Sequence, residues 1–141
     1  MINRLVNGGS FRLRVLLLLL VPVAAAAHHS FAVFFDPDRN VSVTGVVQDF
    51  QFRNPHGLIR ITVKKSDGTE ETWKGETNSP SILERRGWNS ASLKIGETVT
   101  MDGWPARDGS RYLRVRAVRR ADGTMVGNSP TTAAESAGEQ K

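Results

Sequence analysis

The sequence contains no cysteine, which excludes disulfide bonds, thiolate nucleophiles and cysteine-ligated zinc sites. Its hydrophobic core must therefore hold the fold without covalent cross-links. The chain also has only three histidines and one tyrosine. Imidazole is the remaining side-chain nitrogen ligand of choice for a transition metal, so those three histidines are the first candidates for a metal site.

The sequence also lacks an apolar run of the roughly 20 residues that a membrane-spanning helix needs. Its longest apolar run covers residues 15–23, follows three arginines and precedes the small residues Ala25–Ala27. This order predicts a secretory signal peptide over residues 1–27, cleaved after Ala27. An uncleaved N-terminal anchor is the alternative. Since no paired arginines precede the run, we expect Sec-type export. The cleaved protein would then be periplasmic or secreted and would have no membrane span.

Once the signal peptide is removed, the sequence has little excess of one charge over the other. The remaining 114 residues carry 16 basic and 14 acidic side chains. Binding to nucleic acid normally requires a concentrated basic face. The arginines of residues 111–120 are better explained as a solvated face that forms ion pairs with Glu70, Glu71 and Glu76, so we expect no nucleic-acid partner.

Residues 28–128 show the periodicity of a small all-β domain. Alternating apolar residues, glycines and Asp-Gly turns predict five strands, at residues 41–52, 58–65, 70–76, 98–104 and 111–119. A proline-initiated segment predicts one short helix at residues 80–86. Three strands, a helix and two more strands, all expected to be antiparallel, are the element order of an OB-like five-stranded Greek-key barrel. An open β-sandwich is the alternative, but the position of the helix argues against it.

Three finer expectations concern the ends of this domain and its last strand. Residues 31–35 either add an edge strand or pack their phenylalanines over one end of the barrel. Residues 129–141 are rich in small and polar side chains, which predicts a disordered tail. Within the last strand, alternation predicts that Leu113, Val115 and Ala117 face inward and that Tyr112, Arg114 and Arg116 face outward.

Several short blocks occur in a distinctive order. They are His28–Phe31, Phe35–Pro37, Val43–Val47, Asn54–His56 and Arg85–Trp88. In these blocks the chain resembles DUF6152, a family of small exported bacterial proteins of unknown function. The resemblance implies an exported, compact domain and supplies no reaction.

The histidines are the strongest candidate functional group. Cleavage after Ala27 would make His28 the first residue, offering an α-amino nitrogen and an imidazole. His56, in the loop between the first two strands, could add a second imidazole. Three such nitrogens suit Cu(II), and His29 could replace a ligand or support the site by a hydrogen bond. We therefore predict a copper site at His28, His56 and His29. The alternative is that His28 and His29 are solvated and that His56 only pins its turn.

A second hypothesis is a module that binds a small envelope ligand or a protein on the barrel face without metal. OB-folds use the face of the second and third strands, where aromatic and charged candidates are Arg60, Lys64, Trp73, Trp104 and Tyr112. The tryptophans could equally be core residues. We find no catalytic constellation, because adjacent residues such as Glu70 and Glu71 point to opposite faces of a strand. The sequence therefore predicts a monomeric binding protein rather than an enzyme.

Overall fold

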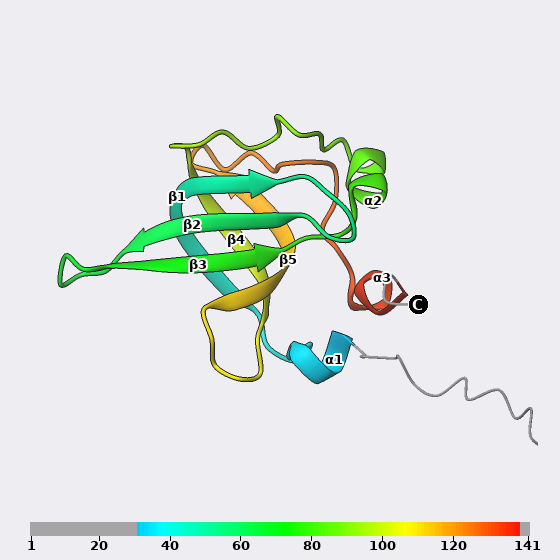
Figure 1. The fold of residues 1–141 in the computed structure, drawn as a ribbon, viewed down its shortest axis with the longest axis horizontal. Helices are drawn as coiled ribbons and strands as arrows, with labels where there is room; N and C mark the ends of the chain where they lie inside the picture. Colours follow the sequence, from blue (N-terminus) through cyan, green and yellow to red (C-terminus); the bar gives the residue numbers. More distant parts are fainter. Residues whose placement is uncertain (1–30, 139–141) are drawn as a thin grey trace, which may run out of the picture.

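The computed structural model describes residues 31–138, and it shows a five-stranded barrel with short helices at its ends (Figure 1). The strands are β1 (Val41–Gln51), β2 (Leu58–Lys64), β3 (Glu70–Glu76), β4 (Thr98–Pro105) and β5 (Tyr112–Arg120). They close in the order β1-β2-β3-β5-β4, and α2 (Pro80–Arg85) lies between β3 and β4 in the chain. This topology confirms the OB-like barrel. The predicted signal peptide, its cleavage site, His28 and His29 fall outside the described residues.

One strand pairing differs from the expectation that every strand is antiparallel to its neighbours. Strand β3 runs parallel to β5, with Lys74 opposite Tyr112 and Glu76 opposite Arg114. A ring of five strands cannot alternate direction all the way round, because five is an odd number. One parallel pair must therefore close the barrel, and it brings the end of β3 beside the start of β5.

The barrel interior follows the alternation predicted for β2, in which Ile59 and Ile61 are fully buried. Strand β1 passes close to β2 at Gly45, where a Cβ atom would lie 2.5 Å from the carbonyl oxygen of Thr62. Glycine is therefore required at this close approach of two backbones. The register shifts just beyond it, between Val47 and Asp49.

Strand β5 departs from its predicted alternation at two points. Leu113 and Val115 are buried as expected, but the register with β4 then shifts, so that Val118 is buried and Ala117 is only partly so. The predicted inward position of Ala117 is wrong, because the residues after a bulge point to the opposite face from the one that simple alternation predicts. Arg114, predicted to face outward into solvent, is fully buried. Its side chain does leave the barrel interior, but the C-terminal segment covers that face.

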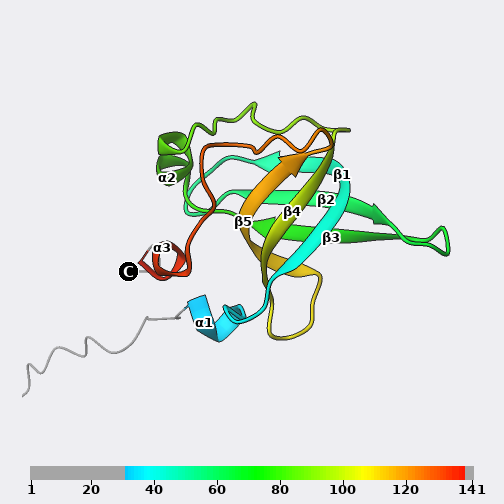
Figure 2. The same ribbon diagram turned by 180° about the vertical axis from the view of Figure 1, so that it is seen from behind.

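Helix α1 (Phe31–Phe34) closes one end of the barrel. The ring centroid of Phe31 lies 5.0 Å from that of Trp104, and both residues belong to a small apolar cluster with Phe35 and Ala106. Of the two expectations for residues 31–35, packing of phenylalanines over a barrel end agrees with the structure. Figures 1 and 2 both show α1 beside the C-terminal helix at this end.

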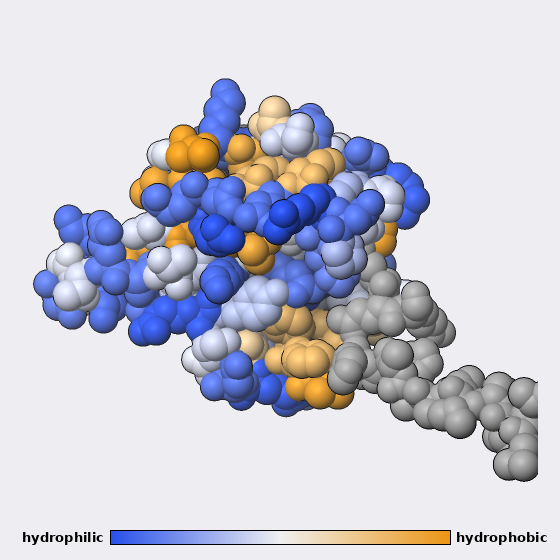
Figure 3. Space-filling view, in the orientation of Figure 1, coloured by the Kyte–Doolittle hydropathy of each residue, from blue (hydrophilic) through white to orange (hydrophobic). Residues whose placement is uncertain are grey.

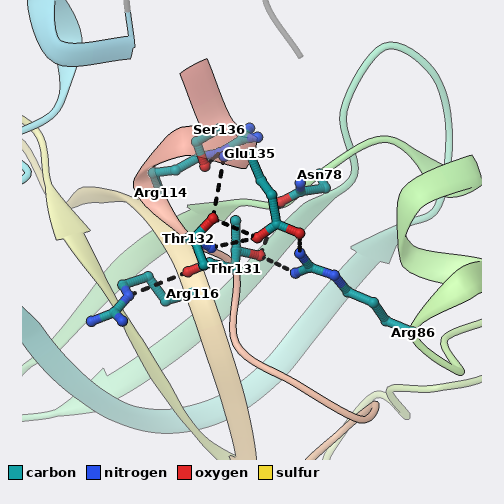
Figure 4. Close-up of polar contacts among 8 residues, drawn as sticks. All are labelled: Asn78, Arg86, Arg114, Arg116, Thr131, Thr132, Glu135 and Ser136. Atoms are coloured by element: carbon teal, nitrogen blue, oxygen red, sulfur yellow. Dashed lines mark hydrogen bonds and ion pairs between the residues drawn. The ribbon is translucent and has the colours of Figure 1, made fainter. Parts of the chain in front are cut away.

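That C-terminal helix, α3 (Ala133–Gly138), differs from the disordered tail predicted from residue 129. Thr132 and Glu135 cap the helix reciprocally, through bonds of 2.7 and 3.3 Å between the side chain of each and the backbone N–H of the other. Thr131 and Ser136 are buried against the barrel. Composition missed this docking because it depends on buried polar contacts (Figure 4), beside the packing of Ala133 on the cluster under α1.

Candidate functional site

A histidine in contact with a carboxylate lies at the end of the barrel that α1 covers. His56 occupies the β1–β2 loop, directly after a cis peptide bond between Asn54 and Pro55. Its Nδ1 lies 3.0 Å from Oε1 of Glu76, and the two side chains are 22% and 18% exposed. Strand pairing explains the contact: Glu76 ends β3 opposite Leu58 of β2, two residues after His56.

Two residues of β5 hold the same carboxylate. Nη1 of Arg114 donates to Oε1 of Glu76 at 2.7 Å, and the Tyr112 hydroxyl donates a short hydrogen bond to Oε2. Burial alone would raise the pKa of Glu76, but the bonds from His56 and Tyr112 and the charge of Arg114 outweigh it and lower that pKa to about 2. Burial and the charge of Glu76 in turn raise the pKa of Tyr112 above its usual range. At neutral pH the site therefore holds an anionic carboxylate and a protonated phenol.

This arrangement fixes which nitrogen of His56 is left for a ligand. An ionised carboxylate can only accept hydrogen bonds, so Nδ1 carries the proton that faces Glu76. In the neutral imidazole Nε2 then keeps its lone pair, and no other residue between 31 and 138 forms a hydrogen bond or ion pair with the ring. Histidines that bind metals commonly have such a carboxylate behind the ring, because it orients the imidazole and raises its basicity.

A pocket of about 430 Å³ lies beside these residues, between α1 and the turn after β4. Val33, Phe34, Phe35 and Ala106 form its apolar wall, while His56, Glu76 and Tyr112 form a polar end. Val33 is 60% exposed and Phe34 is 51% exposed. Figure 3 accordingly shows apolar surface where Figure 1 places α1.

The five residues proposed for a ligand site on the barrel face are not gathered on one surface. Trp104 is 4% exposed and lies in the cluster under α1, with Arg116 over its ring. Trp73 packs against the main core, and its indole N–H donates to Glu71 at 2.7 Å.

Of the other three candidates, Arg60 pairs with Asp49 at 3.2 Å, and Lys64 is exposed at the end of β2. Only Tyr112 lies beside His56, through their shared partner Glu76. Sequence reasoning treated Glu76 and Arg114 as members of a solvated charged face and missed their role. No local signal identifies them, since closure of the barrel between β3 and β5 creates their contact.

A metal at His56 would need ligands from beyond the described part of the chain. Residues 31–138 contain no group of three or more histidine, aspartate or glutamate side chains placed to hold a metal ion. The same residues include no helix with the length and hydrophobicity to cross a membrane.

Comparison with known proteins places the chain in a family. A search of curated proteins gave no match. Among solved structures, the crystal structure of the small single-stranded DNA-binding protein from Streptomyces coelicolor is similar, with 15% identity and a TM-score of 0.37, over 58% of this chain and 90% of that chain. The model of DUF6152, described as a family of unknown function, matches residues 16–114. That match spans more than half of the sequence, and the chain therefore belongs to the DUF6152 family.

Proposed function

We propose that this protein is an exported copper-binding protein whose metal site joins His56 to the amino-terminal His28, with His29 in a supporting role. The observation that carries the proposal is the contact between Nδ1 of His56 and Glu76. It orients the ring and leaves Nε2 as the nitrogen for a metal. Glu76 supports the ring from the Nδ1 side, and its carboxylate also accepts bonds from Tyr112 and Arg114.

The packing of α1 supports the involvement of the amino terminus. Phe31 is anchored on Trp104, and the Phe35 ring lies 5.5 Å from that of Tyr112, whose hydroxyl bonds Glu76. His28 precedes Phe31 by three residues, which span at most roughly 10 Å. A chain cleaved after Ala27 would therefore begin at the end of the barrel that holds His56.

The chemistry of these nitrogens favours copper over other divalent ions. The α-amino group and imidazole of His28, together with Nε2 of His56, would supply three nitrogen donors. Cu(II) prefers tetragonal nitrogen ligation and has the highest affinity in the divalent series. Binding of the ion, rather than turnover of a substrate, is the proposed role. A ligand module on the barrel face has less support, since its candidate residues are dispersed.

The test is a competitive Cu(II) titration at neutral pH of a chain that begins at His28. We expect tight binding, and a loss of at least about 100-fold in affinity when one alanine precedes His28 or when His56 is replaced by alanine, since loss of a ligand should exceed the effect of losing a supporting contact. The His29→Ala variant is the comparison and should lose only about 10-fold, the smaller effect expected of a supporting contact. Equal affinity with and without the added alanine would rule out ligation by the amino terminus.

A further inference from the structure

The pocket beside α1 has aromatic and aliphatic walls that the proposed copper site does not use. Phe34 is the last residue of α1, and Phe35 follows it. The ring centroids of Phe35 and Tyr112 lie 5.5 Å apart, and both residues line the pocket. A volume of about 430 Å³ lies within the range of small-molecule sites, which are mostly apolar with a few placed polar groups. Such walls suit a ligand with a compact apolar body.

The polar end of this pocket offers acceptors. Glu76 is anionic, and the oxygen of Tyr112 can accept a further hydrogen bond. At the rim, the carboxylate of Asp108 accepts the N–H of Ser110 at 2.9 Å, and no cation of the described residues pairs with it.

The cations near the pocket are already engaged. Arg107 lines it, but its guanidinium donates to the carbonyl of Ala32 at 2.8 Å and lies 3.5 Å from Asp36. Arg114, behind Glu76, is buried and bonds the carboxylate and the carbonyl of Thr77. An anionic ligand would have to compete with Asp36 and the carbonyl of Ala32 for Arg107, whereas a cation would meet both carboxylates and aromatic rings.

We propose that this pocket binds a small organic cation, an aryl- or alkylammonium about the size of one ring, with its apolar body against Val33 and Phe34 and its charged nitrogen toward Glu76 and Asp108. The proposal involves neither His28, His29 nor a metal, so it stands or falls independently of copper binding. Attraction between the cation and ring faces adds to the charge contact.

Three one-ring probes that differ in charge test this proposal: benzylammonium, benzyl alcohol and benzoate. The experiment titrates each into the metal-free chain beginning at His28 and follows the ring resonances of Tyr112, which is the sole tyrosine of the sequence. We expect benzylammonium to bind about tenfold more tightly than benzyl alcohol, and benzoate not to perturb Tyr112. Equal shifts with the cation and the alcohol, or no shift with the cation, would overturn the proposal.

Two matched variants localise the charge. Asp108→Asn should weaken benzylammonium several-fold and leave benzyl alcohol unchanged. Asp122→Asn is its control, because Asp122 accepts the N–H of Thr124 at 2.8 Å in the same kind of turn but does not line the pocket. Phe34→Ala should weaken both probes, since it removes apolar wall. Equal effects of the Asp108 and Asp122 substitutions on benzylammonium would contradict the assigned position of the charge.

Discussion

Nδ1 of His56 lies 3.0 Å from Oε1 of Glu76, and this contact joins the β1–β2 loop to the seam at which the barrel closes. Glu76 ends β3, and its other partners, Tyr112 and Arg114, lie on β5. The loop that carries the histidine is therefore fixed by the parallel pair that completes the barrel. Stability of the barrel and geometry of the candidate site share the same side chains.

Loss of the Glu76 charge should change the pH dependence of stability. The pKa of Glu76 is lowered from 4.5 to about 2, so its ionised form stabilises the fold above about pH 5, and this contribution is lost as pH falls towards 2. The shift corresponds to about 3 kcal/mol. We expect Glu76→Gln to lower the free energy of unfolding by an amount of this order at pH 7 and to flatten its fall between pH 5 and 2.

Urea unfolding at a series of pH values measures this effect. Glu84→Gln is the control, because Glu84 is exposed on α2 and forms no ion pair within the described chain. Its stability curve should superimpose on that of the unmodified protein. Parallel curves for Glu76→Gln and the unmodified protein between pH 5 and 3 would show that Glu76 is not held as the structure indicates.

Arg114 should be far more important for stability than the arginines on the surface. Its side chain is fully buried and bonds Glu76 and the carbonyl of Thr77. Removing one member of a buried ion pair costs about 3–5 kcal/mol, because the other charge remains buried. Arg114→Met should therefore destabilise the protein by about that amount, as measured by chemical denaturation.

Arg119→Met provides the comparison for this variant. Arg119 pairs with Asp102 at 2.8 Å, but its side chain is 49% exposed, and such surface pairs contribute about 0–1 kcal/mol. Similar losses for the two variants would contradict the account of a buried charge under α3.

Docking of the C-terminal segment should depend on the ion pair between Arg86 and Glu135. Its guanidinium bonds Thr131 at 2.6 Å and pairs closely with Glu135 (Figure 4). The bond from Arg86 and the N–H of Thr132 lower the pKa of Glu135 to about 2. Because the Glu135 side chain is 42% exposed, we expect Glu135→Gln to cost only about 1 kcal/mol or less.

Hydrogen exchange gives the sharper readout for this segment. The amide of Ser136 donates to the carbonyl of Thr132, and Glu135→Gln should accelerate its exchange because α3 then opens more often. Amides of β2 should be unaffected. Unchanged protection at Ser136 would mean that the ion pair does not hold α3 in place.

Two buried glycines should differ in their tolerance of alanine. At Gly103 a Cβ atom would lie 2.3 Å from the carbonyl oxygen of Arg114, whereas at Gly75 its near neighbours are side-chain atoms of Val115 and Met101. Backbone cannot move as readily as a thioether, so Gly103→Ala should cost about 3 kcal/mol or more and Gly75→Ala about 1–2 kcal/mol. Thermal unfolding of both variants measures the difference, and the reverse order would be inconsistent with the packing described.

The local elements of the fold could be predicted because local signals specify them. Pro80 at the start of α2 and the Asp-Gly turn at Gly68 mark their elements in the sequence itself, and the structure places a helix and a turn there. The alternation of Ile59 and Ile61 likewise identifies the buried face of β2. Such features depend on neighbouring residues, so a single sequence contains them.

The site was less predictable because it depends on contacts between distant parts of the chain. His56 was identified as a candidate, but Glu76 and Arg114 meet only where β3 and β5 close the barrel. The burial of Arg114 depends in addition on α3, whose docking through Thr131 and Ser136 has no apolar signal. Pairing partners and polar docking are set by the whole fold, which alternation along one strand cannot convey.

The most direct test of the copper proposal is a count of coordinated imidazoles by pulsed electron paramagnetic resonance. The chain beginning at His28 is loaded with one equivalent of Cu(II), and its echo modulation is compared with that of His56→Ala. We expect modulation from two imidazoles in the unmodified chain and from one fewer in the variant. An identical modulation pattern in the two proteins would exclude His56 as a copper ligand.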